Sequence, residues 1–413
     1  MKKIKLRNTA IALGIGSAIG IGLSSLTFYK VVFIVLTAVF STRIIVRYKD
    51  KILEILNLKK CITAEDYKER AKIKSENSDF NGALKDLNKA LEIDPNYAYA
   101  YHNRGLTKQE MGDLKEAIID YTKALDINST LIPTYGYRGL AYYLSGEYEN
   151  SLLDFNIVLD QEDKDSDTYV RRALSHYELG NFKETINDCD KALDISPKEN
   201  AAYYPRALAK YYLKDYKGSI QDFGYVLKRD DSDPTVFVIR GLSRYELCEY
   251  EKALEDLNRA EELDPKGFDN YYHRGLIKAI LEDDFEAVKD FDKAFSLFQE
   301  NPLIKMGSAN SKVKLKDYLG AIEDADYALN ISSKLVPAIN AKGLALSEIG
   351  ELEKAINEFN LIVEIEPTFY KVFYNRGLIK KKLGDIKGAC EDWKKAAELG
   401  NEDAAELFEE HCE

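Results

Sequence analysis

A repeat of 34 residues, present ten times in succession between Ala64 and Asp403, constrains this chain more than any other feature. The copies follow one another without insertion or deletion. The eighth place of each copy holds only glycine or alanine: Ala71, Gly105, Gly139, Ala173, Ala207, Gly241, Gly275, Ala309, Gly343 and Gly377. The twentieth and twenty-seventh places are also mostly alanine, as at Ala117 and Ala124. Such positions indicate close approaches between helices.

The positions of glycine and proline inside the repeat predict two helices per copy. Glycines follow the first apolar-periodic stretch in five copies, at Gly112, Gly146, Gly180, Gly350 and Gly384, and suit a left-handed residue that ends a helix. Prolines follow the second stretch at Pro95, Pro197, Pro265 and Pro367, where a residue without a donor N–H ends a helix. Each copy therefore reads as helix, turn, helix, turn, which is typical of a solenoid whose neighbouring copies bury one another's apolar faces.

The repeat resembles a known family at its most regular positions. The second copy carries the aromatic, Gly, Gly, Ala, aromatic, Ala pattern of the tetratricopeptide repeat at Tyr101, Gly105, Gly112, Ala117, Tyr121 and Ala124. The tenth copy repeats it at Phe373, Gly377, Gly384, Ala389, Trp393 and Ala396. The resemblance implies an all-α, right-handed α-solenoid of ten units over residues 64–403, with residues 404–413 as a C-terminal capping helix. It also implies an interaction scaffold, without naming a partner.

Charge is divided unevenly along the chain. Residues 1–60 hold eleven Lys or Arg and two Asp or Glu, so they carry +9, while the net charge of the whole chain is −12. The remaining residues therefore carry −21. Because an acidic solenoid repels phosphate backbones, the repeats are not expected to bind nucleic acid.

The cysteines and histidines do not predict a metal or redox centre. The five cysteines, Cys61, Cys189, Cys248, Cys390 and Cys412, are dispersed without a C-x-x-C pair. An odd, dispersed set indicates reduced thiols and a cytoplasmic setting for the repeats. The four histidines lack metal-ligand spacing. We therefore expect no metal and no cofactor.

The first 47 residues predict a membrane anchor. A run from Thr9 to Tyr29 carries no charge and is long enough to cross a bilayer as a helix, and a second apolar run follows from Val31 to Thr42. A transmembrane hairpin would leave basic residues on both cytoplasmic flanks and the repeats on the cytoplasmic side. One span with an interfacial segment and a cleaved signal peptide are the alternatives. Gly16 and Gly20 form a G-x-x-x-G step, which allows self-association, and residues 48–63 form a basic connector.

Motifs that carry catalysis are missing from the sequence. It contains no phosphate-binding G-x-x-x-x-G-K-[ST] loop, no H-E-x-x-H and no nucleophile elbow. The repeats and the short tail account for the whole chain after residue 63. We therefore predict a protein without enzymatic activity.

Two rows of residues are candidates for a structural or a binding role. The seventh place is arginine in eight copies, as at Arg274, and the twenty-third is always acidic, as at Asp290, so we expect a ladder of structural ion pairs. Tyrosines recur at the twelfth and fifth places and are the candidate protein-binding groove, with packing against the next repeat as the alternative. These tyrosines are Tyr143, Tyr177, Tyr204, Tyr211, Tyr245, Tyr272 and Tyr374.

A carboxylate clamp of the kind found in some tetratricopeptide proteins is not expected. The resemblance would place lysine at the fifth and asparagine at the ninth place of one repeat. Asn310 at a ninth place is preceded by Met306, not lysine, at the fifth. The leading hypothesis is a membrane-anchored scaffold or adaptor that binds proteins or peptides through the concave surface of the solenoid. An assembly factor for a membrane protein complex and a regulatory subunit that presents substrates to a separate enzyme are the alternatives.

Overall fold

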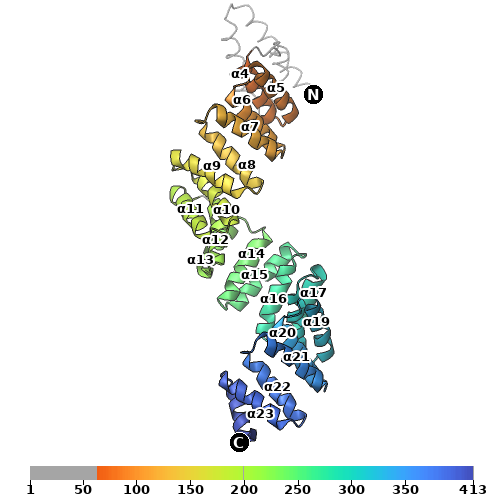
Figure 1. Ribbon diagram of the computed structural model, residues 1–413. Coiled ribbons are helices and arrows are strands. Elements are labelled where there is room, and N and C mark those ends of the chain that lie inside the picture. The colour runs from red at the N-terminus through yellow and green to blue at the C-terminus, as the bar shows by residue number, and fades with distance from the viewer. Residues whose placement is uncertain (1–62, 199, 413) are drawn as a thin grey trace, which may run out of the picture. The chain divides into compact units, whose positions relative to one another are not determined.

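The computed structural model describes residues 63–198 and 200–412, and its regular secondary structure there is entirely helical (Figure 1). The described part of the N-terminal compact unit, residues 63–163, contains six helices: α4 (Ala64–Glu76), α5 (Phe80–Ile93), α6 (Ala98–Glu110), α7 (Leu114–Ile127), α8 (Ile132–Leu144) and α9 (Tyr148–Gln161).

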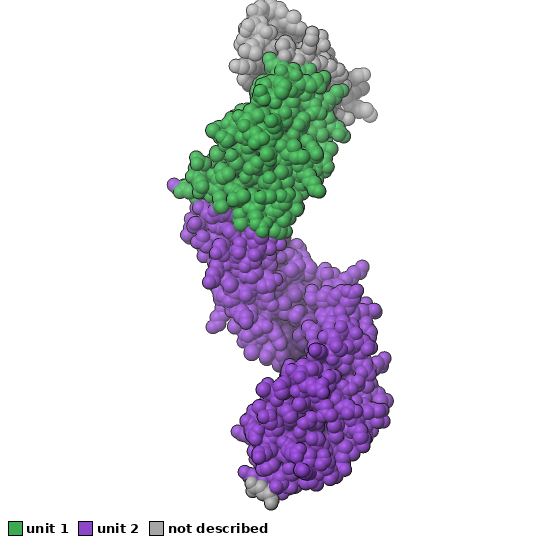
Figure 2. All heavy atoms as spheres, in the orientation of Figure 1, with its two compact units in different colours: residues 1–163 green, residues 164–413 purple. Residues whose placement is uncertain are grey.

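The C-terminal compact unit begins at Lys164 and contains the remaining helices (Figure 2). They are α10 (Ser166–Glu178), α11 (Phe182–Ile195), the 3-10 helix η1 (Asn200–Ala202), α12 (Tyr203–Tyr212), α13 (Tyr216–Leu227), α14 (Pro234–Glu246), α15 (Tyr250–Leu263), α16 (Phe268–Ile280), α17 (Asp284–Leu297), α18 (Pro302–Lys314), α19 (Tyr318–Ile331), α20 (Val336–Glu348), α21 (Leu352–Ile365), α22 (Tyr370–Lys382), α23 (Ile386–Glu398) and α24 (Glu402–Cys412). Both units are thus solenoids of paired helices.

The predicted anchor (1–47) and most of the basic connector lie outside the described residues. Between residues 63 and 412, none of the helices combines the length and the apolar composition that a bilayer span requires.

The small residues lie at close helix contacts, as predicted. An added Cβ at Gly275 of α16 would lie 2.9 Å from the Phe291 ring of α17. On α18 of the next repeat, an added Cβ at Gly307 would lie 2.7 Å from the same ring. Phe291 is almost completely buried, so its ring fills the space that two glycines leave. One aromatic side chain therefore joins two successive repeats, as stacking of neighbours in a solenoid requires.

The turn between the two helices of each repeat has one backbone conformation. The fifteenth place has positive φ in every repeat, and five of these residues are the glycines predicted to end a helix, such as Gly112 at 85°. The other five are not glycine: Ser78, Lys214, Cys248, Glu282 and Lys316, with φ between 58° and 64°. Sequence reasoning missed these five because packing of the helix pair imposes a conformation that L side chains disfavour.

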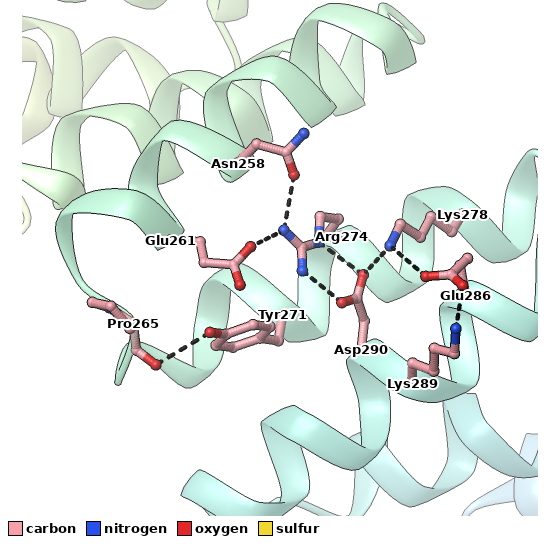
Figure 3. Close-up of polar contacts among 9 residues, drawn as sticks. All are labelled: Asn258, Glu261, Pro265, Tyr271, Arg274, Lys278, Glu286, Lys289 and Asp290. Atoms are coloured by element: carbon pink, nitrogen blue, oxygen red, sulfur yellow. Dashed lines mark hydrogen bonds and ion pairs between the residues drawn. The ribbon is translucent and has the colours of Figure 1, made fainter.

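The predicted ladder of ion pairs is present and is mostly bidentate. Arg274 of α16 donates from Nε and Nη2 to the two carboxylate oxygens of Asp290 on α17, at 2.8 and 2.7 Å (Figure 3). Its third nitrogen, Nη1, donates to Asn258 at 2.8 Å and to Glu261, both on α15 of the preceding repeat. Lys278 adds a second cation, 2.7 Å from Asp290. The arginine therefore holds together two helices of its own repeat and one of the previous repeat.

Two repeats that lack the arginine build the same contact from other residues. Asp324 of α19 accepts from Lys305 at 2.7 Å and from Ser308 at 2.7 Å, and pairs with Lys312 at 2.5 Å. In the next repeat, Lys342 pairs with Glu358 at 2.7 Å. Because the carboxylates stay paired after the arginine is lost, the row is a structural feature of the fold.

The expectation that all cysteines are reduced is wrong for two of them. Cys390 of α23 and Cys412 of α24 form a disulfide, with their Cα atoms 5.7 Å apart. The two residues lie far apart in sequence, so spacing gave no sign of the pair. The packing of α24 along α23 brings them together. Cys189 and Cys248 are free, and Cys61 lies outside the described residues.

Candidate functional site

An open groove crosses the first helices of three successive repeats in the N-terminal unit. It has a volume of about 450 Å³ and is lined by α4, α6 and the start of α8, with Leu87 of α5 contributing. Tyr99, Leu106 and Pro133 supply apolar surface, and about half of Tyr99 is exposed. The groove can therefore receive apolar side chains of a bound segment.

Polar contacts fix the walls of this groove. Lys68 of α4 lies 2.7 Å from Glu65 and 2.8 Å from Glu69, and its ammonium is 5.9 Å from the centre of the Tyr99 ring. Between helices, the hydroxyls of Ser75 and Thr107 are hydrogen-bonded at 3.0 Å. These contacts hold α4 and α6 in register along the groove.

A neutral histidine forms part of the groove wall. His102 of α6 is hydrogen-bonded through Nδ1 to the Thr134 hydroxyl of α8 at 3.0 Å. Burial lowers the pKa of His102 to about 4, so the imidazole is uncharged at neutral pH. The histidine therefore contributes hydrogen bonding and ring surface to the groove, and no charge.

Sequence reasoning did not identify this groove. On α6 its lining residues include the second, fifth, ninth and thirteenth places of the repeat, at Tyr99, His102, Leu106 and Glu110. The helical spacing of these places is visible in the sequence. Which repeats leave an open space along that face is decided by side-chain sizes in three neighbouring repeats.

The predicted tyrosines at the twelfth place are in contact with aromatic residues at the seventeenth place of their own repeats. Ring centroids lie between 5.7 and 6.1 Å apart in four successive repeats. These pairs are Tyr143 with Tyr148, Tyr177 with Phe182, Tyr211 with Tyr216 and Tyr245 with Tyr250. The tyrosines are half-buried, so they stabilise the helix pair and retain exposed surface.

The predicted tyrosines at the fifth place are closer to the core. Tyr204 meets the Phe223 ring edge-on at 6.1 Å, and the buried Tyr272 lies 6.3 Å from Phe291. Tyr374 packs against the core cluster that contains Trp393. The structure thus shows packing roles for these residues, while their predicted role in protein binding stays a prediction.

Groups of His, Cys, Asp and Glu that could hold a metal ion do not occur between residues 63 and 412. Burial raises the pKa of the Cys189 thiol to about 12, which removes its nucleophilic form at neutral pH. Asn310, considered for a carboxylate clamp, donates from its side-chain amide to the carbonyl of Met306 on the same helix at 3.0 Å.

The paired helices stacked repeat upon repeat define a class of helical-repeat solenoids. Family models described as tetratricopeptide or TPR repeats match residues 72–112, 98–131, 166–199, 204–268 and 336–369. Over these segments the chain consists of tetratricopeptide repeats, a family that is typically non-catalytic.

Individual relatives cover parts of the chain. It is 35% identical over 68 residues to "Tetratricopeptide repeat protein 36" of Danio rerio, which is 16% of this chain and 36% of that protein. The match thus spans about a third of that relative.

One solved structure that resembles this chain is a tetratricopeptide repeat protein from Parabacteroides merdae. It is 24% identical with a TM-score of 0.44, and the match covers 59% of this chain and 97% of that one. Another is YrrB, described as having an unusual peptide-binding site, 23% identical, with a TM-score of 0.41, covering 46% of this chain and 97% of that one.

Proposed function

We propose that this protein is a membrane-anchored scaffold or adaptor that binds segments of other proteins along the first helices of its repeats. Residues 1–47 would hold it to the membrane, with the repeats on the cytoplasmic side. The groove across α4, α6 and α8 is the observation that carries the binding part of this proposal. It combines open apolar surface with walls held by hydrogen bonds and ion pairs, as a peptide site requires.

The membrane part of the proposal is supported by the sequence. The uncharged run from Thr9 to Tyr29 is long enough for a spanning helix, and Lys and Arg flank both apolar runs. An anchor would raise the local concentration of the solenoid near membrane-bound partners, which strengthens weak binding without new contacts.

The groove can be tested by cross-linking and affinity capture with the full-length chain in its native membranes. Lys72→Glu and Tyr99→Ala change exposed groove residues, so both variants should fold and lose the proteins that the unmodified chain captures. Lys115→Glu is the matched control, because Lys115 is an exposed lysine on α7 outside the groove. Retention of the same captured proteins by all three variants would exclude the groove as the binding site.

The anchor can be tested separately by alkaline carbonate extraction. The unmodified chain should remain in the membrane pellet. Replacing both Ile15 and Ile19 with aspartate should move it to the supernatant, since each charge near the centre of a span costs roughly 3 kcal/mol. Complete extraction of the unmodified chain would argue against an integral anchor.

A further inference from the structure

Five aromatic rings gather where the first and second helices of two successive repeats meet in the C-terminal unit. The rings of Phe182 and Tyr212 are stacked, with centroids 4.8 Å apart and planes within 5°. Tyr177 lies 6.1 Å from Tyr212, and Tyr211 lies 5.5 Å from it. Tyr216 extends the group from Tyr211 at 5.8 Å. The group therefore joins α10 and α11 to α12 and α13.

Part of this aromatic cluster faces solvent. Tyr212 exposes 54% of its surface although Phe182 covers one face of its ring. The other four rings of the cluster are half-buried, and three of them contact Tyr212: Tyr177, Phe182 and Tyr211. Packing of the two repeats thus fixes the position of an exposed ring, so binding against it costs little side-chain entropy.

Two glutamates lie at the place equivalent to Tyr212 on the helices that neighbour α12. Glu178, Tyr212 and Glu246 occupy the same thirteenth place on α10, α12 and α14, and α12 contacts both neighbouring helices. Burial raises the pKa of Tyr211 and of Tyr216, and the Glu246 carboxylate of the next repeat raises the pKa of both further. Glu178 and Glu246 are exposed and form no ion pair with other residues of the described part of the chain.

An aromatic face between two carboxylates attracts a cation. The ring quadrupole is negative over its face, and arginine also stacks on it through its planar guanidinium. The protein uses this geometry internally, since Arg206 lies 5.3 Å from the centre of the Tyr203 ring. Among residues 164–412, no lysine or arginine lies over any of the five rings of the cluster. Lys214, in the turn after α12, is exposed.

We propose that the aromatic cluster with Glu178 and Glu246 is a docking surface for an arginine-containing segment of a partner protein. The inference rests on the proposed scaffold function and specifies the chemistry of one partner contact. The guanidinium lies against the Tyr212 ring and its charge is balanced by the two carboxylates. Charge complementarity selects this partner, because residues 61–413 carry a net charge of −21.

The test measures binding of a fluorescent hexa-arginine peptide to the purified full-length chain by anisotropy, with hexa-glutamate as the opposite-charge probe. Tyr212→Phe keeps the ring and should leave the affinity unchanged. Tyr212→Leu keeps apolar bulk without the ring face and should weaken binding about three- to tenfold. Replacing Glu178 and Glu246 together with glutamine should weaken it by a similar factor.

Two control variants separate this surface from general attraction to an acidic protein. Glu353→Gln removes an exposed carboxylate of α21, and Tyr225→Leu removes an exposed ring that stacks on Tyr203 instead. Neither should change the affinity. Equal losses in control and test variants, an equal loss in Tyr212→Phe and Tyr212→Leu, or no preference for hexa-arginine over hexa-glutamate would each overturn the proposal.

The outcome also separates this inference from the scaffold function. If the Tyr212→Leu chain still captures every protein that the unmodified chain captures, and binds hexa-arginine equally well, the docking surface is refuted and the scaffold function stands. If the unmodified chain captures no protein reproducibly, the scaffold function itself fails. Circular dichroism spectra of the variants verify that loss of binding does not reflect unfolding.

Discussion

At Gly275, in the eighth place of its repeat, an aromatic ring occupies the space where a side chain would lie. We expect Gly275→Leu to destabilise the C-terminal unit by about 1 to 3 kcal/mol, since Phe291 is held from both sides and cannot move away. Thermal unfolding followed by circular dichroism measures this. Gly224→Leu is the matched control, because an added Cβ there meets nothing within 4 Å. Equal melting temperatures for both variants would show that the eighth place is not tightly packed.

Substituting glycine at a left-handed turn residue should increase stability, in contrast to the substitution at Gly275. Glu282 has a φ of 64°, and we expect Glu282→Gly to stabilise the protein by about 0.5 to 1 kcal/mol, because glycine adopts this conformation without strain. Urea unfolding would show a higher midpoint. Glu255→Gly, in the interior of α15, should instead lower the midpoint. A loss of stability in both variants would contradict the strain argument.

Two half-buried histidines make stability depend on pH. Burial lowers the pKa of both His102 and His273 to about 4, below the usual 6.5. As the pH falls through 6.5, the unfolded chain binds protons that the folded chain does not, so stability decreases until about pH 4. Between pH 6.5 and 4, each histidine can lower the free energy of unfolding by up to about 3 kcal/mol.

Urea titrations between pH 7 and 4 test this dependence. Replacing both His102 and His273 with glutamine should flatten the dependence of the midpoint on pH. An unchanged slope in the double variant would assign the effect to other groups.

At the scale of the helix, α24 completes the C-terminal unit. Leu407 and Phe408 pack against the core cluster around Trp393, and the disulfide fixes the end of the helix to α23. Trp393 is buried and is the only tryptophan in the chain, and His411 of α24 lies 5.9 Å from its ring. Its fluorescence therefore reports on the docking of this helix.

Reduction of the disulfide should loosen α24. A non-reducing proteolytic digest should contain a cross-linked peptide with Cys390 and Cys412, and dithiothreitol should shift Trp393 emission to longer wavelength. Cys390→Ser should reproduce the shift without reductant. Cys248→Ser is the control, because Cys248 is an exposed, free cysteine. Failure to recover the cross-linked peptide would show that the two thiols remain reduced in the protein.

Across the molecule, each repeat depends mainly on its immediate neighbours. We therefore expect removal of residues 268–301, one full period, to leave the mean helicity per residue unchanged by circular dichroism. Removal of residues 284–300 alone deletes α17, which leaves α16 without the second helix of its repeat and α18 without the preceding helix. That chain should lose helicity or aggregate. Equal loss of helicity in both deletions would contradict a nearest-neighbour fold.

The sequence by itself determined the helix pairs, the close contacts and the ion pairs. Each of these depends on residues at a fixed spacing in one repeat, such as Gly275 with Phe291 or Arg274 with Asp290. A period of 34 residues carries that information along the chain without reference to the rest of the fold. The same regularity identified the tetratricopeptide family and predicted no catalytic site.

Only the tertiary structure decided which surfaces are open and which distant residues meet. The groove beside Tyr99, the exposed ring of Tyr212 and the bond between Cys390 and Cys412 depend on side chains from different helices. Their positions follow from how neighbouring helices pack, and one substitution in an adjacent repeat can fill or open the space between them. Spacing along the chain therefore predicted the framework, and packing between helices determined which of its surfaces are open.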